Sequence, residues 1–327
     1  MSRSRYTLLR ENQIPATLWR RAVTAGGQNE ELLVLPPTLV KAYRGLLDEL
    51  GLRQAAESQE PNDEGPQGGK TIEAAYGHFA RNFSGSCARV QLVGLDPKGT
   101  FRTTREAVVR LFSGGELCLL DLPCGAGAAS ATLLGLVAEL RDQALLPRHP
   151  LRVMVLGGDI SEPARTLKKR LFARLRPRLR ECGIDVRVAV QNWDIEDEDQ
   201  TAELIAAWMQ RRQANARTGL LAVNFSAFLH NKVKQCAGAL REILRFARIH
   251  DATVFWIEPR TNAALTGFFP ALSKHVLSKV SRLRVPWAGN GAPRQMQCRV
   301  IHPVQRGGRF TARAAALHLE PVKEVDT

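Results

Sequence analysis

The chain has 327 residues, of which 44% are hydrophobic and 24% charged, and it carries a formal net charge of +14. This is an ordinary globular composition, long enough for one large α/β domain with an appendage or for two domains. No segment holds the ~18 uninterrupted apolar residues of a membrane span, and no apolar secretory core follows the basic N-terminus, so we expect neither a membrane span nor a secretory signal.

The cysteines and the charge narrow the possibilities further. The six cysteines are scattered, without a CxxC pair or a paired spacing with His, so we expect no metal site and a reducing, cytoplasmic location. The positive charge is compatible with an acidic partner such as RNA, but it is equally compatible with a solvated, Arg-rich surface.

Residues 1–54 are predicted to form an N-terminal, mostly helical region. A helix start is expected at Pro15, with proline in the first turn, and a second helix near Pro36, which would bury Leu39, Tyr43, Leu46, Leu47 and Leu50. This region is either a cap for substrate recognition or dimerisation, or a segment packed against the main domain. Residues 55–70 are polar with Pro and Gly, and they predict a linker before a main domain at 71–327.

Two helices are expected before the first strand of the main domain, over residues 71–83 and 104–112. The first carries Tyr76, His78, Phe79 and Arg81, which either line the mouth of a ligand site or form a packing face.

Residues 117–130 form the stretch around which the chain is organised. An apolar run ends at Asp121, a turn with Gly125 and Gly127 follows, and the next segment has helical periodicity. In such a strand–loop–helix unit the helix N-terminus has unpaired N–H groups, and the glycines let a ligand approach the backbone. The alternative is a tight turn that serves only packing.

Strands then alternate with helices. Apolar runs at 151–156, 186–190, 220–224 and 252–257 are separated by helical segments, and two strand-like runs at 295–301 and 310–319 are joined by a Gly-containing turn. The pattern predicts an α/β fold: a doubly wound, Rossmann-like, mostly parallel sheet closed by a C-terminal antiparallel hairpin. Ligands bind beyond the carboxyl ends of such strands, where the sequence has Asp121, Asp159, Asp194 and Asn224.

These motifs resemble class I S-adenosylmethionine-dependent methyltransferases over roughly residues 71–320. Residues 120–127 resemble the family's acidic, Gly-rich first motif, residues 155–161 its second-strand motif, and residues 192–194 its third. The segment 223–231 resembles the fourth-strand segment of small-molecule members. The resemblance implies S-adenosyl-L-methionine as cofactor, and a transfer by in-line displacement to a small-molecule or protein acceptor.

The resemblance also implies roles for individual residues. Asp121 would lie near the cofactor's ammonium, Gly125 and Gly127 behind its methionine moiety, and Asp159 at the ribose hydroxyls. Asp194 would meet the adenine amine and Trp193 would flank the ring. Cys124, Ile160 and Asn224 complete the implied cofactor-binding set. A base is needed only for a protonated acceptor, and His230 is the first candidate, with His78 second.

Some features depart from the family or favour other functions. Pro123 replaces the first glycine of the usual loop and removes an N–H. The basic run 168–180 favours an RNA methyltransferase if it contacts phosphate, whereas an amphipathic helix with a solvated outer face is the alternative. A non-catalytic binding or assembly module on the same fold is a third possibility. A nicotinamide dehydrogenase is disfavoured, because Asp159 lies farther from the glycines than the roughly 20 residues usual there.

Overall fold

The computed structural model describes residues 13–23, 27, 29–58, 69–261, 263–280, 283–284 and 293–321. Its ten strands form one sheet in the order β1-β2-β9-β10-β7-β6-β3-β4-β5, with β8 paired to β10. The strands are β1 (Trp19–Val23), β2 (Asn29–Leu33), β3 (Gly115–Leu122), β4 (Leu151–Asp159), β5 (Ile184–Asn192), β6 (Arg217–Val223), β7 (Thr253–Pro259), β8 (Leu283–Arg284), β9 (Arg294–Ile301) and β10 (Arg309–Pro321).

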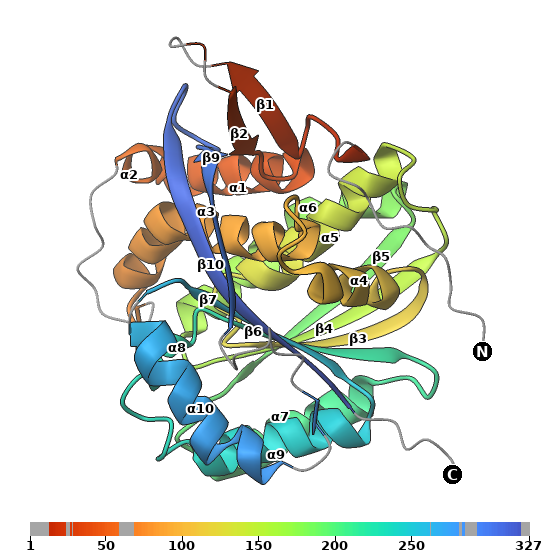
Figure 1. The fold of residues 1–327 in the computed structure, drawn as a ribbon, viewed down its shortest axis with the longest axis vertical. Helices are drawn as coiled ribbons and strands as arrows, with labels where there is room; N and C mark the ends of the chain where they lie inside the picture. Colours follow the sequence, from red (N-terminus) through yellow and green to blue (C-terminus); the bar gives the residue numbers. More distant parts are fainter. Residues whose placement is uncertain are drawn as a thin grey trace.

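Helices cover both faces of this sheet (Figure 1). They are α1 (Pro37–Leu50), α2 (Arg53–Glu57), α3 (Ile72–Leu95), α4 (Arg102–Leu111), α5 (Ala128–Asp142), α6 (Glu162–Glu181), α7 (Glu198–Arg211), α8 (Ser226–Leu229), α9 (Ala237–Ile249) and α10 (Phe269–His275), with a π-helical turn η2 (Ala263–Phe268) and a 3-10 turn η3 (Leu277–Lys279).

Strands β3 to β7 form the parallel part of the sheet. The chain runs outward from β3 through β4 to β5, and then returns to the other side of β3 to form β6 and β7. The direction of winding therefore reverses between β3 and β6. This confirms the predicted doubly wound architecture, and it marks the carboxyl edge of β3 and β6 as the place where ligands bind in open α/β sheets.

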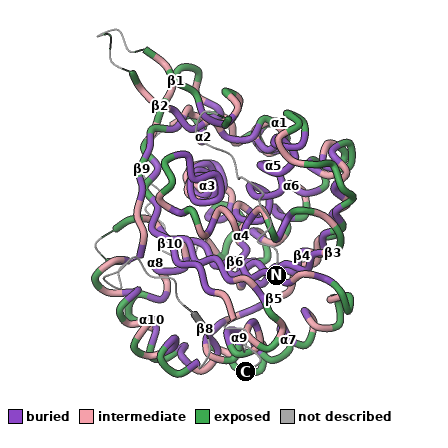
Figure 2. Tube along the Cα trace, turned by 45° about the vertical axis from the view of Figure 1, so that its right-hand side comes forward, coloured by how far each residue is buried: buried purple, intermediate pink, exposed green. Residues whose placement is uncertain are grey.

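The two faces of the sheet bury separate hydrophobic clusters, because successive side chains of a strand point to opposite sides. In β3, Leu117 and Leu119 join a cluster with α1, α3, α5 and α6, whereas Cys118 and Leu120 join one with α7, α9 and α10. Figure 2 shows α3 end on, buried around most of its circumference. The helix that borders the cavity described below is therefore a core helix.

The predicted hairpin is confirmed as β9 and β10. Strand β10 runs antiparallel to both β9 and β7, so that it lies between them.

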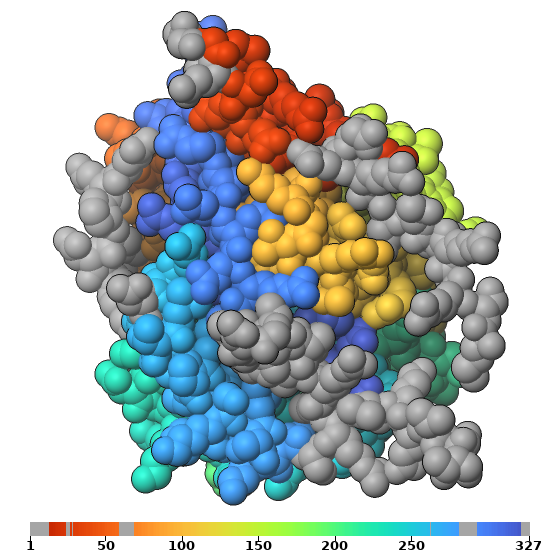
Figure 3. All heavy atoms as spheres, viewed as in Figure 1, coloured from red at the N-terminus to blue at the C-terminus, as the bar shows by residue number. Residues whose placement is uncertain are grey.

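The N-terminal region differs from the helical prediction at its start. Pro15 opens a turn, in which the Leu18 N–H donates to the Pro15 carbonyl (2.9 Å), and the chain continues as β1 rather than as a helix. The prediction was wrong because strand pairing overrides the local signal: β1 pairs with β2, and β2 lies parallel to β9 at Leu32 and Leu33. Figure 3 shows these N-terminal strands packed beside the C-terminal hairpin.

The predicted second helix is confirmed as α1, which buries Leu39, Tyr43, Leu46 and Leu47 and leaves Leu50 half-buried. The region shares one hydrophobic cluster with α3 and α5, so it packs against the rest of the molecule. Most of the predicted linker, residues 59–68, lies outside the described residues.

Two further findings concern the described residues alone. None of their helices is both long and apolar enough to cross a membrane. In the same ranges, no cluster of three or more His, Cys, Asp or Glu side chains is arranged to hold a metal ion.

Candidate functional site

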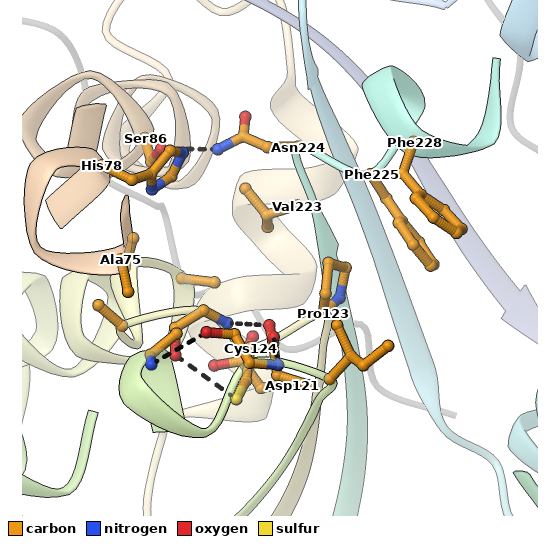
Figure 4. Close-up of a pocket in the computed structure, with 18 of the residues that line it drawn as sticks. Ala75, His78, Ser86, Asp121, Pro123, Cys124, Val223, Asn224, Phe225 and Phe228 are labelled. Carbon is orange, nitrogen blue, oxygen red and sulfur yellow. Dashed lines mark hydrogen bonds between the residues drawn. The ribbon is translucent and has the colours of Figure 1, made fainter. Parts of the chain in front are cut away.

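A cavity of about 190 Å³ opens at the carboxyl ends of β3, β4, β5 and β6. One part of its lining, here called the strand-end half, comes from residues 121–129, 159–164 and 193–196. The other part, the helical half, comes from α3 and from residues 223–228, and Lys70, just before α3, completes the lining. Figure 4 shows Asp121 and Cys124 on one side of the cavity and His78, Ser86 and Asn224 on the other, with Val223 between them.

The structure brings eight of the predicted site residues to this cavity: Asp121, Cys124, Gly125, Asp159, Ile160, Trp193, Asp194 and Asn224. Gly127 lies behind the lining, between Ala126 and Ala128, where it begins α5. His230 is exposed, and its ring lies against Gly267 in η2: a Cβ on Gly267 would come within 2.6 Å of the His230 Cε1 atom. His230 is therefore not part of the cavity lining.

Asp121 forms an ion pair with a buried lysine. Lys168 of α6 places its Nζ 2.6 Å from Asp121 Oδ2, and the two side chains are 0% and 1% exposed. The Ser130 hydroxyl donates to the same oxygen (2.6 Å). Although burial lowers it, the pKa of Lys168 stands above its usual value, because the Asp121 carboxylate and neighbouring groups stabilise the ammonium. Asp121 Oδ1 is buried and has no hydrogen-bond partner among the described residues.

The loop at residues 123–127, here called the β3 loop, packs so closely on β4 that the strand has room only for glycine. A Cβ on Gly157 would lie 2.8 Å from Cys124 Sγ and 2.9 Å from Lys168 Nζ. The Cys124 N–H donates to the Gly158 carbonyl (2.8 Å). Burial raises the pKa of the Cys124 thiol, so Cys124 is a packing residue that is not poised as a nucleophile.

Asp159, at the end of β4, fastens the β3 loop to the next one. Its Oδ2 accepts the Gly125 N–H (2.7 Å) and its Oδ1 accepts the Ser161 N–H (2.9 Å). Burial raises the pKa of Asp159, and these two N–H groups oppose that shift. The Ser161 hydroxyl donates to the Gly69 carbonyl (2.7 Å), which holds the segment before α3 beside Asp159.

The residues after β5 present an aromatic face and a carboxylate. The Trp193 indole N–H donates to the Thr201 hydroxyl (3.0 Å), which fixes the ring at the cavity. Asp194 Oδ1 accepts the Glu196 N–H (3.0 Å), and the Asp194 N–H donates to Gln200 (3.0 Å). The strand-end half thus offers the Asp121, Asp159 and Asp194 carboxylates, which lie at or just after the ends of β3, β4 and β5, and the Trp193 ring.

Asn224, at the end of β6, joins the sheet to α3. Its backbone has φ of 57°, in the left-handed region. Its Oδ1 accepts from Arg89 Nε (2.9 Å), and its Nδ2 donates to the Ser86 hydroxyl (2.7 Å). Burial lowers the pKa of Arg89 to about 10. A strained residue held by side-chain bonds at a cavity wall is typical of a functional position.

Glu258, at the end of β7, is a residue whose role the sequence analysis missed. It is fully buried, and it accepts hydrogen bonds from the Phe225 N–H (2.9 Å), the Ser226 N–H (3.0 Å) and the Trp256 indole (2.7 Å). Burial raises the pKa of Glu258 to about 7. It anchors the residues after β6 that line the cavity. The signal in the sequence was its position, since Glu258 also follows an apolar strand.

His78 of α3 lines the helical half and is half-buried. Burial, and next the positive charge of Arg89, lowers the pKa of His78 below its usual value. Its imidazole is therefore neutral near pH 7 and able to accept a proton.

Several cations of the basic run on α6 form ion pairs within the molecule. Arg170 and Arg174 both pair with Glu49 of α1, and Arg178 pairs with Asp142 (2.6 Å) and Glu181 (2.8 Å). The run lies on an amphipathic helix that buries Leu171, Phe172, Leu175 and Leu179, which agrees with the second of the two predicted interpretations.

No protein-family model matches this sequence, and no curated protein matches it. The chain is similar in fold to a protein from Listeria monocytogenes assigned as a class I S-adenosylmethionine-dependent methyltransferase, with 12% identity, a TM-score of 0.31, and coverage of 89% of this chain and 88% of that one. It is also similar to human N-acetylserotonin methyltransferase in complex with S-adenosylmethionine, with 12% identity, a TM-score of 0.27, and coverage of 94% and 80%. Neither similarity carries weight in the proposal below.

Proposed function

We propose that the chain is an S-adenosylmethionine-dependent methyltransferase that acts on a small-molecule or protein acceptor. The observation that carries this proposal is the convergence of the β3 loop, Asp159 and Asp194 on one cavity at the switch point of a doubly wound sheet. This convergence is the arrangement that the resemblance of the three strand-end motifs leads one to expect.

Several groups that line the cavity fit S-adenosylmethionine. Asp121 Oδ1, which has no donor among the described residues, is available to an ammonium group. Gly125 has φ of 45°, and a Cβ at this position would meet nothing within 4 Å, so the loop leaves space for a ligand. Asp159 and Asp194 are acceptors for ribose hydroxyls and for an exocyclic amine, and Trp193 offers a ring face to adenine.

When bound, the cofactor supplies a methyl group on a sulfonium, which is already activated toward displacement. The protein then needs mainly to hold the two reactants in line and to exclude water, and positioning of this kind supplies much of the rate. The RNA alternative is weakened, because Lys168 is buried and Arg170, Arg174 and Arg178 of α6 are engaged in ion pairs within the molecule.

Calorimetric titration with S-adenosylhomocysteine tests the proposal. We expect micromolar binding by the wild type, and a weakening of about tenfold to a hundredfold in Asp194→Ala and Asp159→Ala, because each loses a hydrogen-bond acceptor for the ligand. Asp185→Asn is the matched control, since Asp185 lies near the amino end of β5 on the opposite edge of the sheet. Thermal unfolding of each variant separates lost binding from lost fold. Failure of the wild type to bind would refute the proposal.

A further inference from the structure

The helical half of the cavity differs chemically from the strand-end half. Its lining combines phenylalanine rings from two elements, Phe79 and Phe83 of α3 and Phe225 and Phe228 after β6, with His78. Figure 4 shows that His78 and Asn224 lie on the side of the cavity away from Asp121 and Cys124. His78 therefore lies away from Asp121, the residue assigned to the cofactor's ammonium, on a side of the cavity where a second molecule has room to meet the cofactor.

The rings make this region suited to a flat apolar group. Phe225 and Phe228 are nearly parallel, with an interplanar angle of 15° and ring centroids 6.0 Å apart. Phe79 and Phe83 pack on each other with centroids 4.9 Å apart. Aromatic ligands gain from offset and edge contacts with such rings, in addition to the area that they bury.

The charges around the helical half disfavour a cationic ligand. Among the described lining residues, α3 and residues 223–228 contribute no carboxylate. Glu196 of the strand-end half accepts from Lys232 (2.9 Å) and Gln235 (2.8 Å), and the Lys232 ammonium lies 4.6 Å from the centre of the Phe228 ring. Arg89 adds positive charge behind Asn224.

The polar groups of this region provide a proton acceptor. The Ser86 hydroxyl is already engaged, since it accepts from Asn224 (2.7 Å) and donates to the Asn82 carbonyl (3.1 Å). In the helical half, the neutral imidazole of His78 is thus the group that can take a proton from a ligand.

From these features we propose that the helical half holds an aromatic acceptor with an ionisable hydroxyl, such as a phenol, and that His78 is the catalytic base. This inference rests on the proposed methyltransferase function. The acceptor O–H bond breaks as its proton moves to the His78 imidazole. The oxygen forms a bond to the methyl carbon as the carbon–sulfur bond breaks, and the positive charge of the sulfonium is replaced by that of the imidazolium.

A matched set of three probes tests the ligand class. The protein is saturated with S-adenosylhomocysteine and titrated calorimetrically with 4-ethylphenol, 4-ethylbenzylamine or 4-ethylcyclohexanol. We expect 4-ethylphenol to bind at least about tenfold more tightly than either, a difference equivalent to about 1.4 kcal/mol. Equal or tighter binding of the amine or the cyclohexanol, or no binding of the phenol to the complex, overturns the inference. Failure of the protein to bind S-adenosylhomocysteine overturns the proposed function itself, and this inference with it.

A variant of the aromatic wall locates the binding site. Phe228→Ala is expected to weaken 4-ethylphenol binding about tenfold, because a buried ring contact is lost, and to leave the affinity for S-adenosylhomocysteine unchanged. Phe228→Leu, which preserves bulk, is the second variant if Phe228→Ala does not fold. Unchanged phenol binding in a folded variant contradicts the assigned position.

The role of His78 is tested against that of His230. In single-turnover methylation of 4-ethylphenol, His78→Gln is expected to lower the rate by about a hundredfold or more, as when a general base is removed. Its calorimetric affinities for 4-ethylphenol and S-adenosylhomocysteine should stay within about threefold of the wild type. His230→Gln should retain the wild-type rate. The opposite pattern, with His230→Gln inactive and His78→Gln active, would assign the base to His230.

Discussion

Two carboxylates are buried beneath the cavity, and they are stabilised in different ways. Asp121, under the β3 loop, is 1% exposed and pairs with the Lys168 ammonium at 2.6 Å. Glu258, under the residues after β6, is 0% exposed and receives three N–H groups, with no cation in hydrogen-bond contact among the described residues. Both hold a cavity-lining segment in place.

The two ways of stabilising a buried carboxylate have different consequences for the stability of the protein. An ion pair stabilises the charge of both partners, but each then depends on the other, because an unpaired buried charge is very costly. Peptide and indole N–H groups stabilise a carboxylate less completely, so Glu258 retains a raised pKa of about 7. The contribution of the Asp121–Lys168 pair to stability is therefore sensitive to mutation of either partner, and that of Glu258 is sensitive to pH.

Lys168→Met should remove the ion pair with Asp121 and lower the free energy of unfolding more than any other variant proposed below. Removing one partner of a buried ion pair costs about 3–5 kcal/mol of unfolding free energy, because Asp121 is left as an uncompensated charge. The double variant Lys168→Met/Asp121→Asn should recover most of that loss. Urea denaturation measures both. Lys169→Met is the control, since Lys169 is exposed on the same helix. A single variant within about 1 kcal/mol of the wild type would contradict the contrast.

The contribution of Glu258 to stability should depend on pH. Between about pH 4.5 and 7 the folded protein keeps a proton on Glu258 that the unfolded chain has released, so this group's contribution to stability falls as the pH rises. The shift corresponds to about 3 kcal/mol. The stability advantage of the wild type over Glu258→Gln should therefore be larger at pH 5 than at pH 8. Equal differences at the two pH values would exclude the raised pKa.

Substitutions at two glycines test the packing of the β3 loop and its ligand-facing side separately. Gly157 lies under the loop, and Gly125 faces open space. Gly157→Ala should cost about 1–3 kcal/mol of stability by overpacking, because its Cβ would meet Cys124 and Lys168 within 3 Å. Gly125→Ala meets nothing within 4 Å, and it should cost only the roughly 1–2 kcal/mol of a left-handed backbone. We expect Gly125→Ala to weaken S-adenosylhomocysteine binding more than it lowers stability. If Gly157→Ala proves the milder of the two in urea, the described loop packing is wrong.

The strand-end part of the site could be predicted from the sequence because strand ends are local features. Apolar runs that end in Asp121, Asp159, Asp194 and Asn224 place these residues on one edge once the strands are parallel. The doubly wound, mostly parallel architecture also followed from the alternation of strands and helices.

What the sequence left hidden depends on tertiary contacts. Lys168 belongs to a run of basic residues, and only its helical spacing from Leu171 and Leu175 indicated the buried face. Two of the three hydrogen-bond partners of Glu258, Phe225 and Ser226, lie more than thirty residues earlier in the chain. The pairing of β2 with β9 joins Leu32 to Arg299, a separation that no local propensity encodes. His230 resembled a family motif, yet its position beside Gly267 depends on where η2 packs.

The position of β10 has a consequence for how the molecule is synthesised. Because β10 lies between β7 and β9, the edge of β7 stays unpaired until residues 309–321 have left the ribosome. Strand β2 likewise awaits β9, although it emerges early. Such non-local pairing makes folding slow and leaves a hydrophobic strand edge exposed during translation. The nascent chain is therefore expected to depend on chaperones more than a sheet assembled in sequence order would, and truncation before β10 should produce aggregation rather than a smaller folded domain.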